Sequence, residues 1–199
     1  MIRWPIFRAA LVAAALAAAV APFTASHAHP HVFIEYSVTV VVGAGGVEAV
    51  QLTWTFDEFT SGMIMQQFDK DRDGILSPAE VRSVERGHFA ETRESQHFVV
   101  LRLNDAPVPV EAVRDFTARA ASGIVTYTFT VPLRRPPAAE GRLEVLADDP
   151  TVFIAFDLAP RAPVQVRAPA GFTVDCRAIK DPKGAALDFV RCTWKRSGR

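Results

Sequence analysis

The sequence predicts a mainly β protein of the α+β class, with a β-sandwich-like fold and one helix–loop–helix inserted after the second strand. Short stretches in which apolar and polar residues alternate recur along most of the chain. Turn-forming residues separate them about every 8–12 residues, a spacing typical of β-sandwiches. At about residues 57–94 the apolar residues instead follow helical spacing. We therefore treat residues 29–199 as a single β-rich domain that carries a helical insert.

The strands are expected in the following order. Residues 32–40 and 47–56 alternate in polarity on either side of a glycine-rich turn, which predicts a β-hairpin. After the insert, we expect strands at residues 98–103, 108–116, 123–132, 142–146, 151–158, 164–167, 171–176 and 187–194. No internal repeat accompanies this pattern.

The first 28 residues have the organisation of a secretory signal peptide. Arg3 and Arg8 give a positive start, residues 9–21 are apolar, and the small residues Ser26 and Ala28 suit a cleavage site after Ala28. The apolar run is short for a membrane span, although an uncleaved N-terminal anchor is the alternative. The sequence thus predicts an exported, periplasmic protein that begins at His29.

Residues 69–80, DKDRDGILSPAE, match the calcium-loop pattern D-x-[DN]-x-[DN]-G-x5-E without a mismatch. Gly74 stands where the loop turns sharply, and the six ligand positions are occupied by Asp69, Asp71, Asp73, Ile75 (through its carbonyl), Ser77 and Glu80. Four carboxylates without a nitrogen or sulfur ligand favour a hard cation, so calcium is the expected cofactor.

An acidic surface turn followed by a capped helix is the alternative interpretation. Ser77 and Glu80 form a capping box with Pro78 at the first helical position, but capping does not explain three alternate aspartates followed by glycine. Apolar residues at helical spacing flank the loop, so the segment from about residue 60 to 93 resembles an EF-hand. Because we find one such loop in a chain predicted to be exported, we expect a structural calcium site rather than a switch.

Charge and cysteine content narrow the function classes. The chain has 22 basic and 22 acidic residues, a balance that does not indicate nucleic acid or an anionic membrane as a partner. Its two cysteines, Cys176 and Cys192, lie in strand-like segments around a turn-forming run. In an oxidising compartment they are expected to form a disulfide; a soft-metal pair or a thiol nucleophile is disfavoured because no histidine lies nearby.

The predicted mature protein begins His29-Pro30-His31. On an extended chain two imidazoles spaced by one residue face the same side, roughly 6.6–6.8 Å apart, and the free α-amine would join His29. This set suits nickel, cobalt, copper or zinc. A frayed polar start is the alternative. His88 and His97 are further candidates if the fold brings them close, as are Asp57 and Glu58, which otherwise begin a helix.

Three segments together carry a family resemblance: residues 29–34 (HPHVFI), residues 54–60 (WTFDEFT) and the acidic loop from Phe68 to Glu80. The chain resembles an uncharacterised family of exported bacterial proteins that are labelled the substrate-binding component of an uncharacterised ABC-type transport system. Members are often encoded beside NicO-type nickel/cobalt transporters. The resemblance implies a role near transition-metal transport, with an inner-membrane metal transporter as partner. The two α/β lobes usual in solute-binding proteins are not indicated by this sequence.

Three functions compete at this point. The first is a calcium-stabilised periplasmic metal-binding accessory protein that handles nickel, cobalt or zinc for a membrane transporter. The second is a calcium-stabilised interaction module with no transition-metal role. The third is an enzyme, which the sequence disfavours because it contains no nucleophile elbow, no H-E-x-x-H pair and no phosphate-binding glycine loop.

Overall fold

Strands form two β-sheets in the computed structural model, which describes residues 30–133, 139–180 and 187–197. The first sheet has the order β5-β6-β2-β1-β8, with β9 also pairing with β1. Its strands are β1 (Val32–Gly43), β2 (Gly46–Phe56), β5 (Arg114–Ala121), β6 (Ile124–Pro132), β8 (Ile154–Leu158) and β9 (Val164–Arg167). The predicted signal peptide and His29 lie outside the described residues.

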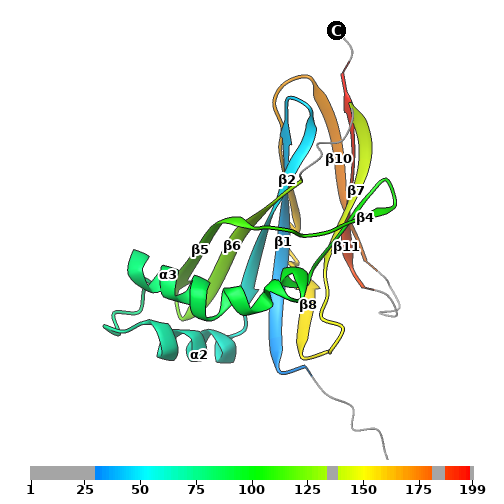
Figure 1. Cartoon of the computed structure of the whole chain (residues 1–199). Coiled ribbons are helices and arrows are strands. Elements are labelled where there is room, and N and C mark those ends of the chain that lie inside the picture. The colour runs from blue at the N-terminus through cyan, green and yellow to red at the C-terminus, as the bar shows by residue number, and fades with distance from the viewer. Residues whose placement is uncertain (1–29, 134–138, 181–186, 198–199) are drawn as a thin grey trace, which may run out of the picture.

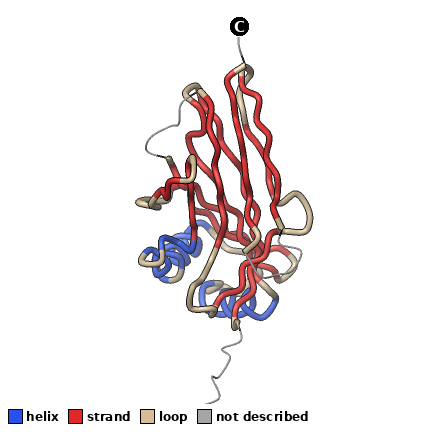
Figure 2. Tube along the Cα trace, turned by 90° about the vertical axis from the view of Figure 1, so that its right-hand side faces the viewer, coloured by secondary structure: helices blue, strands red, loops and turns tan. Residues whose placement is uncertain are grey.

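The second sheet has the order β10-β11-β7-β3-β4 and is antiparallel throughout. Its strands are β3 (Val99–Leu103), β4 (Ala106–Val108), β7 (Glu140–Ala147), β10 (Phe172–Ile179) and β11 (Phe189–Arg196). Figure 2 shows the two layers of strands side by side, with the helices gathered at one end. The predicted β-sandwich-like fold is therefore confirmed.

The helical insert comprises α2 (Glu58–Phe68), α3 (Pro78–Gly87) and the 3₁₀ turns η1 (Phe89–Arg93) and η2 (Gln96–Phe98). It covers the part of the first sheet that the second sheet leaves open, over β5 and β6 (Figure 1). Among the described residues, no helix is long and apolar enough to cross a membrane.

Alternation of residue type explains why the first sheet has one buried face. On β1, alternate residues from Ile34 to Val42 are buried, while Glu35, Ser37 and Thr39 point the other way. The register of β1 with β2 places Tyr36 opposite Trp54, so the largest side chains of both strands enter the same core. Burial of such aromatic surface supplies much of the free energy of folding.

Phe89 fixes the insert to the sheet. Its ring packs against Phe116 (4.5 Å between centroids), Phe129 (4.8 Å) and Trp54 (6.1 Å), and it is almost fully buried. The helical pattern in the sequence predicts that Phe89 lies on an apolar face. It does not predict these contacts, because the three rings come from three different strands.

One predicted strand is wrong. Residues 108–116 do not form a single strand: β4 ends at Val108 and β5 begins at Arg114, with irregular backbone between them. Pro109, directly after β4, explains the interruption, because proline has no N–H to donate to a neighbouring strand. The β3–β4 hairpin turns at Asn104 and Asp105, both with positive φ.

The predicted disulfide is present. Cys176 on β10 and Cys192 on β11 are directly opposite each other in the antiparallel register and are bonded, with 4.1 Å between their Cα atoms. The Cys192 side of the bridge lies in the core. The bond thus ties the edge strand β10 to β11.

Loss of this bridge is expected to destabilise the protein by about 3 kcal/mol, because a loop of this length then regains its freedom in the unfolded chain. The variant for this test is Cys176→Ser/Cys192→Ser, compared with the parent by urea denaturation with and without reductant. Reductant should lower the stability of the parent only; an unchanged parent midpoint would contradict the prediction.

Candidate metal centre

The acidic loop is held between two capped helices. Asp57 caps the N-terminus of α2: its Oδ1 accepts from the Thr60 amide (2.8 Å), and its Oδ2 accepts from the Thr60 hydroxyl (2.7 Å) and the Phe33 amide (3.0 Å). Burial raises the pKa of Asp57, but these donors outweigh it and the pKa is lowered. Asp57 therefore begins helix α2, which is the role that the sequence offered as the alternative to metal binding.

The structure brings the first three predicted ligands together. One carboxylate oxygen each from Asp69, Asp71 and Asp73 lie within 4.8 Å of one another. Asp69 is the C-cap of α2 and is only 8% exposed, whereas Asp71 and Asp73 are exposed. Among the described residues, Asp69 Oδ1 is buried without a hydrogen-bond partner, although its Oδ2 accepts from the Gly74 amide (3.0 Å).

The backbone of the loop is shaped to keep these carboxylates inward. Arg72 and Gly74 both have positive φ, 59° and 82°, and turn the chain back on itself. The Ile75 amide donates to Asp73 Oδ1 (2.9 Å), which fixes that side chain. Glycine at position 74 removes the strain that a side chain would introduce at this φ, as the motif predicted.

Glu80 serves as a helix cap in this structure. Its carboxylate accepts from the Lys70 amide (2.6 Å), the Ser77 amide (2.9 Å) and the Ser77 hydroxyl (2.8 Å), so it joins the two ends of the loop. The Lys70 and Ser77 donors hold the pKa of Glu80 below its usual value. The predicted capping box is thus present, while Glu80 is not among the three clustered carboxylates.

Negative charge accumulates at the open side of the loop. The Asp73 amide lowers the pKa of Asp71, but desolvation and the charges of Asp73 and Glu80 outweigh it, and the pKa is raised. A carboxylate whose charged form is disfavoured by its neighbours gains from a nearby cation. The donor set is oxygen only and the buried Asp69 Oδ1 lacks a partner, so these residues fit a hard cation such as calcium.

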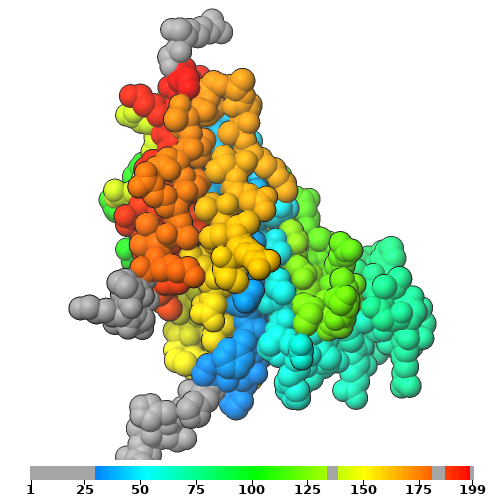
Figure 3. Space-filling model, turned by 180° about the vertical axis from the view of Figure 1, so that it is seen from behind, coloured from blue at the N-terminus to red at the C-terminus, as the bar shows by residue number. Residues whose placement is uncertain are grey.

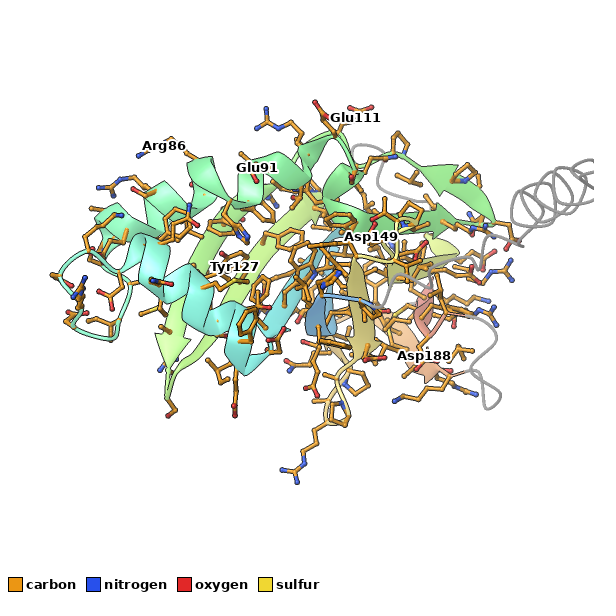
Figure 4. All side chains as sticks on the ribbon, turned by 90° about the horizontal axis from the view of Figure 1, so that it is seen from below. Arg86, Glu91, Glu111, Tyr127, Asp149 and Asp188 are labelled. Carbon is orange, nitrogen blue, oxygen red and sulfur yellow. A yellow bond between two sulfur atoms is a disulfide. The ribbon has the colours of Figure 1, made fainter. Side chains whose placement is uncertain are left out.

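The candidate transition-metal residues do not all meet. His31 is exposed and packs against Phe153 (5.1 Å between ring centroids). His88 is the C-cap of α3, and its Nδ1 is 2.9 Å from the Tyr127 hydroxyl. Figure 4 shows Tyr127 between α2 and α3. Both histidines line one groove of about 440 Å³, whereas His97 is buried elsewhere.

His97 belongs to the core. Its ring stacks on Phe89 (4.6 Å, 17° between planes), and its Nδ1 is 2.6 Å from the Thr92 hydroxyl. Burial, with a smaller effect of Arg93, lowers the pKa of His97 to about 4. Because His97 is enclosed by Phe89 and Thr92, it is unsuited to an exposed metal site.

The lowered pKa of His97 predicts acid destabilisation. Histidine in the unfolded chain has a pKa near 6.5, whereas the pKa of His97 in the folded state is about 4. Between these values the unfolded state binds more protons than the folded state, so the free energy of unfolding decreases as the pH is lowered from about 6.5 to about 4. The check compares thermal midpoints of the parent and His97→Gln at pH 7 and 4.5. The parent should lose more stability on acidification than the variant; equal losses would contradict the prediction.

Two features of this region had no clear sequence signal. The groove shared by His31 and His88 joins segments far apart in the chain, so no local motif predicts it. Gln96, His97 and Phe98 all have positive φ although none is glycine. The carbonyl of Phe98 accepts from Asp148 (2.9 Å), and the Gln96 side chain accepts from Val110 (3.0 Å). Such long-range bonds offset the strain of this turn.

Comparison with known proteins gives relatives without an established activity. A curated protein from Spirochaeta aurantia, described as an uncharacterized 15.5 kDa protein in the trpE 3′ region, is 29% identical over 109 residues, 55% of this chain and 77% of that protein. A family model described as "Protein of unknown function (DUF1007)" matches residues 14–186. The match covers the first sheet, the acidic loop and every strand of the second sheet except β11, and the chain therefore belongs to the DUF1007 family.

Proposed function

We propose that this chain is an exported, calcium-stabilised metal-binding accessory protein. The observation that supports it best is the cluster of Asp69, Asp71 and Asp73, with a buried and unpartnered Asp69 oxygen at the end of α2. An oxygen buried without a partner costs about 1–3 kcal/mol, which a cation at this point would offset.

The calcium is proposed to be structural. The loop connects α2 and α3, and both helices contact the first sheet. A cation among the three aspartates would cancel their repulsion and hold the two helices at a fixed spacing. Extracellular calcium modules bind with dissociation constants of about 10⁻⁴–10⁻³ M, an affinity sufficient outside the cytoplasm.

The periplasm is the proposed compartment. Disulfides persist in oxidising compartments, and the chain has one between Cys176 and Cys192. The signal-peptide pattern of residues 1–28 agrees with export. An inner-membrane metal transporter would then be the partner.

The transition-metal part of the proposal uses His29 and His31, with His88 in the same groove as His31. Nickel, cobalt, zinc and copper are the candidate ions. The test measures their binding to the processed protein, to His29→Ala/His31→Ala and to the matched control Asp71→Asn. Binding lost in the histidine variant and kept in the control is expected; equal binding by all three would refute this part.

An interaction module without transition-metal chemistry is the second candidate. Phe59, Met63 and Phe153 support it, because all three are exposed around the groove. Capture of a membrane partner that depends on calcium but survives His29→Ala/His31→Ala would favour this function over metal handling.

A further inference from the structure

One face of α2 is apolar and uncovered. Phe59 and Met63 are four residues apart, so they lie on the same side of the helix, and they are 71% and 44% exposed. Ile64 and Phe68, also at helical spacing, are buried against the sheet. The helix therefore presents apolar side chains in two directions, and the described residues cover only one of them.

The opposite wall of the groove holds a further exposed ring in a rigid turn. Phe153 is 52% exposed and lines the groove with Phe59, Met63 and His31. Asp149 holds the turn that contains Phe153, because its carboxylate accepts hydrogen bonds from the amides of Thr151 and Ile154, both at 2.9 Å. Neighbouring Val152 has a φ of 60°, which is strained for a β-branched residue. The turn thus holds an apolar side chain in solvent instead of allowing it to collapse.

Unpaired carboxylates border these apolar residues. Glu35 and Asp157 are opposite each other in the parallel register of β1 and β8, and both are exposed. With Asp57 they line a hollow of about 240 Å³ that also contains Phe33. Like charges directly opposite each other destabilise a sheet, and neither carboxylate has an ion-pair partner in the described part of the chain.

The hollow and the groove are neighbouring sites at the start of β1, with no lining residue in common. Both take residues from the start of β1 and from the β2–α2 junction: Val32 and Phe59 line the groove, and Phe33 and Asp57 line the hollow. In Figure 3 the start of β1, in blue, lies between the yellow segment before β8 and the cyan β2–α2 junction. We call this surface, defined by Phe33, Glu35, Phe59, Met63, Phe153 and Asp157, the apolar–acidic surface.

We propose that the apolar–acidic surface binds a basic amphipathic segment of a partner protein. Apolar side chains of the segment fill the groove between Phe59 and Phe153, and its lysine or arginine side chains pair with Glu35 and Asp157. Charge complementarity selects this occupant: the acidic margin repels an anionic bilayer and disfavours a second copy of the same surface. The inference adds a contact surface to the proposed function and needs no transition metal.

The test uses the processed protein with calcium and a fluorescein-labelled 14-residue helix of leucine and lysine, followed by fluorescence anisotropy. A matched peptide with glutamate in place of lysine is the charge control. The lysine peptide is expected to bind at least about tenfold more tightly, with an affinity that falls as salt is raised. Equal binding of the two peptides, or absence of saturable binding, would overturn the proposal.

Variants locate the binding. Phe59→Ser/Met63→Ser and, separately, Glu35→Gln/Asp157→Asn are each expected to weaken the lysine peptide about tenfold or more. The matched controls are Val166→Ser, an exposed apolar residue on β9, and Glu85→Gln/Glu94→Gln, exposed carboxylates outside the surface. If the control variants bound the lysine peptide as weakly as the surface variants do, the assignment would be overturned. Binding of the protein to anionic vesicles in place of the peptide would also overturn it. Calcium titration of each variant distinguishes this failure from failure of the calcium site.

Discussion

Calcium is expected to raise the thermal unfolding midpoint of the processed protein by roughly 5–10 °C, and Asp71→Asn is expected to abolish most of this increase. A ligand at 100 times its dissociation constant stabilises the folded state by about 2.7 kcal/mol. For a chain of this size, each kcal/mol corresponds to about 2–4 °C. Differential scanning fluorimetry with and without calcium measures the shift.

Asp71 is the informative position because little else depends on it. Its carboxylate is exposed and accepts one long hydrogen bond, from the Asp73 amide at 3.4 Å. Asp69 would be a poorer choice, since it accepts from Gly74 and caps α2. Glu85→Gln, which removes an exposed carboxylate from α3, is the matched control and should keep the full shift. An Asp71→Asn protein that responds to calcium like the parent would contradict the site.

Phe89→Ala is expected to destabilise the protein by about 3–5 kcal/mol, the usual cost of deleting a buried ring. Phe89 contacts rings from β2, β5 and β6 and stacks on His97, so its removal leaves a cavity where the insert meets the sheet. Urea denaturation gives the free energy of unfolding. Weaker calcium binding should accompany the change, because the helices that hold the loop lose their attachment.

Phe153→Ala is the matched control for the Phe89 prediction. It deletes the same ring from a position that is 52% exposed, so the expected loss of stability is below about 1 kcal/mol. If both variants lost the same stability, the packing of the insert on the sheet would not be what holds the two parts together.

Local pattern was sufficient to predict the first sheet's hairpin, the helix–loop–helix and the disulfide. Alternation along β1 and β2 fixes which residues face the core, and the motif in residues 69–80 fixes the turn at Gly74. The Cys176–Cys192 pairing followed from a strand–turn–strand pattern around two cysteines. In each case the determining residues are close together in the sequence.

Features that depend on distant segments were not predictable in this way. Phe59 and Met63 share helical spacing with the buried Ile64 and Phe68, yet they face solvent, because exposure depends on where the sheet ends beneath α2. The left-handed turn at residues 96–98 depends on bonds to Val110 and Asp148.

The two candidate ligand sets also differ in whether their residues are close together in the sequence. The aspartates cluster because one loop carries them, whereas the histidines depend on the fold: His31 and His88 share a groove, and His97 is enclosed by Phe89 and Thr92.

Calorimetric titration of the processed, metal-free protein with calcium tests the central claim most directly. The account predicts one calcium ion per chain, bound with a dissociation constant of about 10⁻⁴–10⁻³ M or tighter, and loss of that binding in Asp71→Asn. No saturable binding up to about 10 mM calcium, well above that range, would contradict a calcium-stabilised protein. Binding that survives Asp71→Asn unchanged would contradict the site at Asp69, Asp71 and Asp73.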